Sequence, residues 1–195
     1  MTKDKALELL HSKMQSVNLR KHCYSVGAVM RALADYFAKK DKSADAKAMA
    51  DKWEIVGLLH DGDYEFTKDD PANHAKLMAN WVRDTGESDK ELLEGIESHG
   101  WFHEGKLPQT KMQWALFCCD ELTGLIIAVT LVRPEKKLSV VTVDNVLSKW
   151  NAKSFAAGVK REDIENCEKE LGIKLADFIQ IALNAMQGIS KELGL

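Results

Sequence analysis

The chain has 195 residues, of which 45% are hydrophobic and 29% are charged, with a net charge of −3 and a pI near 6.1. These values are typical of a soluble protein with a substantial core, and they give no support for a nucleic-acid-binding surface. There is no run of about 18 apolar residues that would predict a membrane span. Residues 1–5 lack the apolar segment of a secretion signal, and the four cysteines follow no zinc or redox spacing. We therefore predict a cytoplasmic protein that binds neither nucleic acid nor a membrane, and the composition predicts no particular oligomeric state.

Apolar residues recur at helical spacing through most of the chain, and each of its three prolines lies near an apparent helix boundary. Asp70 and Pro71 together resemble the start of a helix, with an N-cap followed by a proline in the first turn. Glycines at positions 62 and 100 are expected to end helices. In the first half of the chain the pattern predicts helices at about 3–14, 19–39 and 44–61, one beginning at Asp70-Pro71, and one at about 88–100.

The second half of the chain is also expected to be helical. A long apolar helix follows Pro108, and two more helices are predicted at about 143–153 and 161–193. An interruption near Gly172 is the alternative for the last of these, and a short strand over 138–143 is a further alternative. The sequence therefore predicts one all-α domain, with a helical core at about 19–130 and a C-terminal helical extension at about 134–195.

Several ionisable residues occupy the apolar faces of these predicted helices. Burying an imidazole or a carboxylate without a partner costs several kcal/mol, so a set of such residues suggests one shared partner. A divalent metal would neutralise the carboxylates and accept the imidazole lone pairs. The set consists of His22, His60, Asp61, His74, His99 and Asp120.

Each candidate ligand also has a simpler interpretation. A single histidine on an apolar face is more often structural than functional, and Asp61 might serve only to cap backbone amides. Asp120 lies midway along the most hydrophobic predicted helix and could pair instead with an arginine. Adjacent helical residues point about 100° apart, so His60 and Asp61 can both reach one metal only where the helix ends, which Gly62 allows.

In identity and order these residues resemble the signature of the HD superfamily of metal-dependent phosphohydrolases. The signature is an early histidine (His22), an adjacent His-Asp pair (His60-Asp61, within the segment 57–63) and a late aspartate (Asp120). The resemblance covers about residues 19–130, which would form an HD-domain helical bundle. It implies that these four residues hold one metal, and that His74 and His99 could hold a second metal bridged by Asp61.

The chain is most similar to small stand-alone proteins of the HDIG type. It departs from that label because Gly62-Asp63 stands where Ile-Gly is usual, and no Gly-Tyr-Pro signature follows, which argues against cyclic-di-GMP hydrolysis. A mixture of imidazole and carboxylate ligands suits Mn, Fe, Zn, Co or Ni better than Ca. One or two such ions are expected.

The resemblance implies a metal-dependent phosphohydrolase that acts on a phosphate ester of a nucleotide or related small metabolite through a metal-activated water. Asp61 would be a central catalytic ligand, with Asp63 or Glu65 as general acid or base. The alternative is a metal-binding regulatory or ligand-binding HD module without turnover. Candidate contacts for the substrate phosphate are Arg133, Lys153 and Arg161, with Lys160 in the same segment, although each of these could be an ordinary surface charge.

Overall fold

Helices form every regular element of the computed structural model, which describes all 195 residues. The predicted all-α class is therefore confirmed. The helices are α1 (Lys3–Lys13), α2 (Val17–Asp41), α3 (Ala46–Leu59), α4 (Tyr64–Thr67), α5 (Lys76–Asp84), α6 (Lys90–Glu97), α7 (Lys111–Leu131), α8 (Val143–Leu147), α9 (Arg161–Leu171), α10 (Leu175–Gly188) and α11 (Ser190–Leu193). Three short 3-10 helices complete them: η1 (Pro71–Asn73), η2 (Ser98–Glu104) and η3 (Leu138–Val140).

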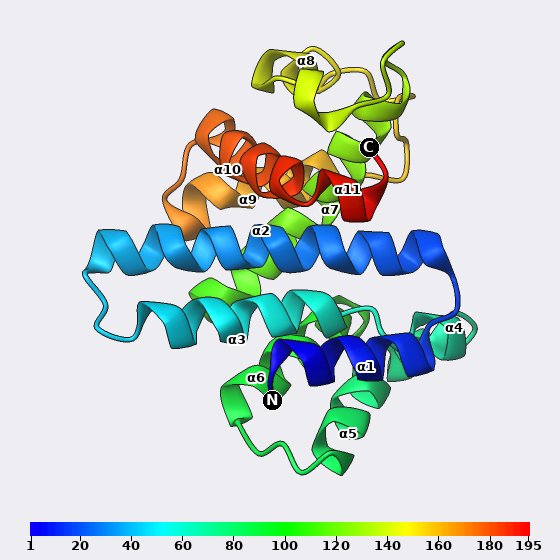
Figure 1. The fold of residues 1–195 in the computed structure, drawn as a ribbon, viewed down its shortest axis with the longest axis vertical. Helices are drawn as coiled ribbons and strands as arrows, with labels where there is room; N and C mark the ends of the chain where they lie inside the picture. Colours follow the sequence, from blue (N-terminus) through cyan, green and yellow to red (C-terminus); the bar gives the residue numbers. More distant parts are fainter.

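The long pair α2 and α3 forms the centre of the molecule, and no other two helices contact each other as extensively. In Figure 1 α2 lies between α3 and α1 on one side and α9 and α10 on the other. The pair can approach closely because two glycines face each other where the helices cross. A Cβ atom added at Gly57 would lie only 2.8 Å from the Cα atom of Gly27. No larger residue fits at this crossing, so the two glycines set the separation of the helices.

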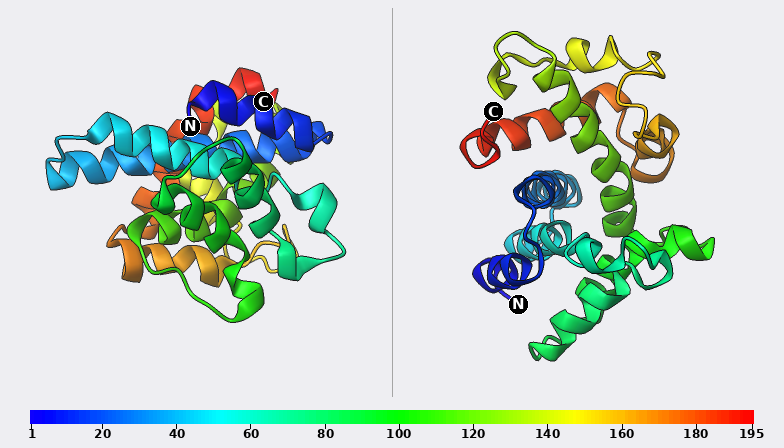
Figure 2. Two further views of the ribbon diagram at one scale, coloured as in Figure 1. Left: turned by 90° about the horizontal axis from the view of Figure 1, so that it is seen from below. Right: turned by 90° about the vertical axis from the view of Figure 1, so that its right-hand side faces the viewer.

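Helix α7 crosses this pair and packs against both α2 and α9 (Figure 2). By length and composition α7 is apolar enough to span a membrane, but the core helices of soluble proteins meet the same criteria. In the fold, 56% of the most apolar 18-residue stretch of α7 is buried. Its first turn is closed by a capping box. The Gln113 N–H donates to Thr110 Oγ1 at 3.3 Å, and the Thr110 N–H donates to Gln113 Oε1 at 3.1 Å.

We expect Thr110→Ala to lower the free energy of unfolding by about 1 kcal/mol, because the Gln113 amide loses its side-chain acceptor. Urea denaturation of the variant and the wild type measures this difference. Thr110→Ser retains the hydroxyl and should recover most of the loss. A serine variant as unstable as the alanine variant would show that the threonine methyl group matters more than the cap.

The C-terminal helices pack onto the rest of the molecule. α10 contacts α2, α7 and α9, and one hydrophobic core extends from Ala6 in α1 to Leu193 in α11. The predicted helix over 161–193 is interrupted, as the alternative anticipated, because Gly172 adopts a left-handed conformation (φ 64°) and ends α9. A second interruption separates α10 from α11 at Ile189.

Four predictions about individual elements differ from the structure. The segment 138–143, considered as a strand, contains the 3-10 helix η3, and the helix predicted over 143–153 ends already at Leu147. The helix predicted to begin at Pro71 is instead η1 followed by α5, because Ala75 adopts a left-handed conformation (φ 64°) between them. Gly100 does not end a helix, since the chain continues through it as η2.

Candidate metal centre

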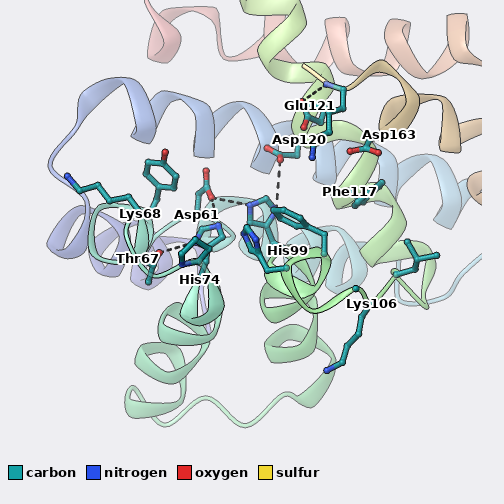
Figure 3. A pocket seen from close by; sticks show the side chains of 17 residues that line it. Asp61, Thr67, Lys68, His74, His99, Lys106, Phe117, Asp120, Glu121 and Asp163 are labelled. Carbon is teal, nitrogen blue, oxygen red and sulfur yellow. Dashed lines mark hydrogen bonds and ion pairs between the residues drawn. The ribbon is translucent and has the colours of Figure 1, made fainter. Parts of the chain in front are cut away.

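The six predicted ligands come together at one place in the fold, although they come from five separate segments of the chain. Figure 3 shows four of them, Asp61, His74, His99 and Asp120, on the wall of a pocket. Helix ends and connections supply most of them. His60 and Asp61 follow the last residue of α3, so both side chains can reach the same point, as the helix end at Gly62 led us to expect. The remaining four are His22 in α2, His74 between η1 and α5, His99 in η2 and Asp120 in α7.

One half of the cluster is built from two histidines and two carboxylates. The Nε2 atom of His22 lies 2.9 Å from Asp120 Oδ1 and 3.6 Å from Asp61 Oδ2. The Nε2 atom of His60 lies 3.2 Å from His22 Nε2, 3.4 Å from Asp120 Oδ1 and 3.7 Å from Asp61 Oδ2. Neighbouring ligands on a transition metal, with bonds near 2.1 Å, are separated by about 3.0–3.4 Å. The four atoms therefore fit a single divalent ion.

The other half of the cluster uses the second oxygen of Asp61. Asp61 Oδ1 lies 3.1 Å from the Nε2 atom of His74 and 3.1 Å from the Nε2 atom of His99. The two oxygens of one carboxylate thus face two different pairs of histidines. A carboxylate placed in this way could contact a cation on each of its two sides.

Hydrogen bonds on the far side of the rings orient the histidines. His60 Nδ1 lies 2.8 Å from the carbonyl oxygen of Gly57, which can only accept, so this nitrogen carries the proton. The Thr123 hydroxyl donates to the Asp120 carbonyl oxygen at 2.9 Å, and its oxygen lies 3.5 Å from His22 Nδ1. With Nδ1 turned to these partners, Nε2 is the ring nitrogen that faces the cluster and can ligate a metal once its own proton is lost.

The electrostatics of the cluster match a site for a cation. Burial alone would lower the pKa of His22, but the hydrogen bond to Asp120 and the charges of Asp120 and Asp61 raise it to about 9. Burial opposes ionisation of Asp61 as well, yet the neighbouring histidines hold the pKa of that carboxyl well below its usual range. The pKa of Asp120 is lowered in the same way by His22 and His60. Both carboxylates are therefore charged, and metal binding would displace protons from the histidines.

The simpler interpretations of the aspartates do not describe the structure. No arginine pairs with Asp120: Arg31 pairs with Asp51 and Glu54, and Arg83 pairs with Glu97. Arg133 donates to Asn145. Both oxygens of Asp61 face imidazoles, so this residue does more than cap a helix end.

A cavity of about 590 Å³ opens from the metal centre to solvent. Its wall includes Asp61, His74, His99 and Asp120, so a ligand in the cavity would contact both halves of the cluster. Three lysines also line it, namely Lys68, Lys106 and Lys160, and the exposed ring of Phe102 lies at its edge. Lys106 is paired with Glu104, whereas the ammonium group of Lys160 lies 5.2 Å from the centroid of the Phe102 ring.

The two residues predicted as proton carriers lie elsewhere. Asp63 is fully buried, and its carboxylate contacts His74 and the backbone of Met78. The carboxylate of Glu65 accepts hydrogen bonds from the backbone amides of Gln15 and Ser16 and does not line the cavity. Neither carboxylate lines the cavity, so the structure gives no support to their expected role as general acid or base, which stays a prediction.

The predicted phosphate contacts are also outside the cavity. Arg161 donates to the backbone carbonyl oxygens of Phe155, Ala156 and Val159, and Lys153 is exposed to solvent. With Arg133 bonded to Asn145, none of the three lines the cavity. Of the lysines and arginines between residues 133 and 161, only Lys160 lines the cavity. Lys68 and Lys106 were not recognised because a surface lysine has no distinguishing sequence signal.

Together the helical bundle and its cluster define an all-helical protein whose histidines and aspartates could hold a metal ion. The sequence matches the HD domain family over residues 19–178, and the chain belongs to this family. The match continues through α9 and into α10, well beyond the predicted core boundary near residue 130. No curated protein and no solved structure matched the chain.

Proposed function

We propose that this protein is a metal-dependent phosphohydrolase that cleaves a phosphate ester of a nucleotide or related small metabolite. The HD domain is the domain of a superfamily of metal-dependent phosphohydrolases. The observation that carries the proposal is the carboxylate of Asp61, whose two oxygens face two pairs of histidines on the wall of an open cavity. We further propose two metal positions, an HDIG-like protein and a cytoplasmic location.

The first position would be held by His22, His60, Asp61 and Asp120, and the second by Asp61, His74 and His99. A divalent metal bound there would act as a Lewis acid and lower the pKa of a water molecule. The residues of the chain would hold the ligand atoms in fixed positions before the substrate binds, and they would present positive charges to an anionic substrate. Lys68 and Lys160 line the cavity and can neutralise phosphate oxygens.

The size of the cavity agrees with a small substrate. About 590 Å³ lies within the usual range for small-molecule sites. The exposed ring of Phe102 at the edge offers an apolar surface to the part of the substrate that is not phosphate. These features support a nucleotide or a metabolite of similar size over a polymer.

A screen of phosphorylated metabolites tests the function. The protein is stripped of metal, reloaded separately with Mn²⁺, Fe²⁺, Co²⁺, Ni²⁺ or Zn²⁺, and assayed for phosphate release. Asp61→Asn, which retains the side-chain volume, serves as the inactive control. Release by the wild type and none by the variant supports the proposal. If no compound is hydrolysed with any metal, the non-enzymatic HD module becomes the better explanation.

The positions of the lysines lead to a prediction about substrate binding. Lys160→Gln should raise KM roughly 10–100-fold, because a hydrogen bond between charged groups contributes about 1.5–3 kcal/mol. Lys153→Gln is the matched control, since Lys153 belongs to the same segment but does not line the cavity. Steady-state kinetics on the best substrate of the screen measures both. Equal effects of the two substitutions would exclude a direct role for Lys160.

A further inference from the structure

His74 differs from the other histidines of the cluster in what holds its ring. His60 bonds to a backbone carbonyl and His22 lies next to a hydroxyl. His74 Nδ1 instead lies 2.9 Å from Oδ1 of Asp63, a carboxylate with no exposed surface. The hydroxyl oxygen of Thr67 lies 3.1 Å from the same nitrogen.

Each carboxylate oxygen of Asp63 has a hydrogen-bonding partner. Oδ1 faces His74, and Oδ2 accepts the backbone N–H of Met78 at 2.9 Å. The Thr67 hydroxyl donates to the Asp63 carbonyl oxygen at 3.0 Å, so its oxygen is free to accept from His74. His74 Nδ1 therefore donates to Asp63, and Nε2 is the ring nitrogen that faces Asp61 Oδ1, 3.1 Å away, where it can ligate a metal once its proton is lost.

The backbone around His74 is fixed by tertiary contacts as well. Ala75 has a left-handed conformation that takes His74 out of the following helix. A Cβ atom added at Gly100 would lie 2.3 Å from the His74 carbonyl oxygen, so η2 packs directly on this peptide. These contacts fix the position of the His74 backbone, and the Asp63 carboxylate fixes the orientation of the imidazole ring.

We propose that Asp63 is a positioning residue that determines whether the His74 and His99 half of the centre holds its metal. A carboxylate bonded to the far nitrogen of a ligating histidine orients the ring and makes it a stronger ligand, and loss of such a partner typically weakens metal binding 10–100-fold. No equivalent carboxylate supports His22 or His60, so the effect is confined to one half of the centre. This inference rests on the two metal positions of the proposed function.

Asp63→Asn and Asp63→Ala test the proposal. An asparagine has the same shape but cannot accept from both His74 Nδ1–H and the Met78 N–H, because one of its two polar atoms is itself a donor. Asp69→Asn, an exposed carboxylate in the same segment, is the matched control. Each protein is loaded with Co²⁺ and dialysed, the ions per chain are counted by elemental analysis, and the visible Co²⁺ spectrum is recorded during titration.

We expect two ions per chain in the wild type and in Asp69→Asn. Asp63→Asn should retain one tightly bound ion and bind the second roughly 10–100-fold more weakly. Circular dichroism shows whether each variant is folded, and Thr67→Val provides a milder change in case Asp63→Ala does not fold. Two ions with unchanged affinity in Asp63→Asn, or equal weakening of both, would overturn the role assigned to Asp63. A wild type that never binds more than one ion would overturn the two-metal proposal and this inference with it.

Discussion

Replacement of Asp61 by alanine should release all metal from the protein and abolish hydrolysis. Asp61 faces the histidines of both halves of the cluster, with Oδ2 facing His22 and His60 and Oδ1 facing His74 and His99. Without Asp61, each half of the cluster keeps only its other ligand atoms. The four histidines also lose the carboxylate that offsets their positive charge when they are protonated. Elemental analysis of the purified variant measures the loss directly.

The same substitution should remove the stabilisation that metal gives to the fold. A ligand that binds only the folded state at a thousandfold excess over its Kd contributes about 4 kcal/mol. Added metal should therefore raise the unfolding temperature of the wild type and leave that of Asp61→Ala unchanged. Asp69→Ala, which removes an exposed carboxylate from the same segment, should behave as the wild type does. Metal content unchanged in Asp61→Ala would refute the assignment of the centre.

Gly57→Ala should strongly destabilise the fold. The new Cβ atom would lie 2.8 Å from Gly27 Cα and 2.9 Å from the Val26 carbonyl oxygen, and these backbone atoms cannot move without separating α2 from α3. We expect a loss of about 3 kcal/mol or more in the free energy of unfolding, at the upper end of the usual cost of overpacking. For a protein of this size that corresponds to a fall of roughly 6–12 °C in Tm.

The same change should also weaken metal binding, because α2 carries His22 and α3 leads into His60. A wider helix pair would move the two Nε2 atoms apart from their present separation of 3.2 Å. Gly124→Ala in α7 is the control. Its nearest neighbour would be a Val159 methyl group at an ordinary 3.8 Å, so it should stabilise the helix by about 1 kcal/mol. Opposite signs for the two substitutions in urea denaturation would support close packing at Gly57, and a harmless Gly57→Ala would contradict it.

The sequence by itself was sufficient to predict that the histidines and aspartates of the cluster come together, while their role as metal ligands stays a prediction. His22 and Asp120 lie on apolar helices and His60 directly follows one, and burying an ionisable group there is costly enough to be informative. The same local signals predicted the long helices α2, α3 and α7 and offered the interruption at Gly172 as an alternative, because periodicity, capping residues and glycine act over a few neighbouring residues.

Only the tertiary structure decided the surroundings of those ligands. His74 was expected within a helix, but contacts with Asp63 and Gly100, distant in the sequence, hold it outside one. The expected proton carriers Asp63 and Glu65 contact His74 and the backbone just before α2, respectively. Of the candidate cations from Arg133 to Arg161, only Lys160 lines the cavity. Which side of a short connection faces a cavity depends on how distant segments pack against it. Periodicity carries no information about that packing, so the cluster of histidines and aspartates was predictable from the sequence and the cavity beside it was not.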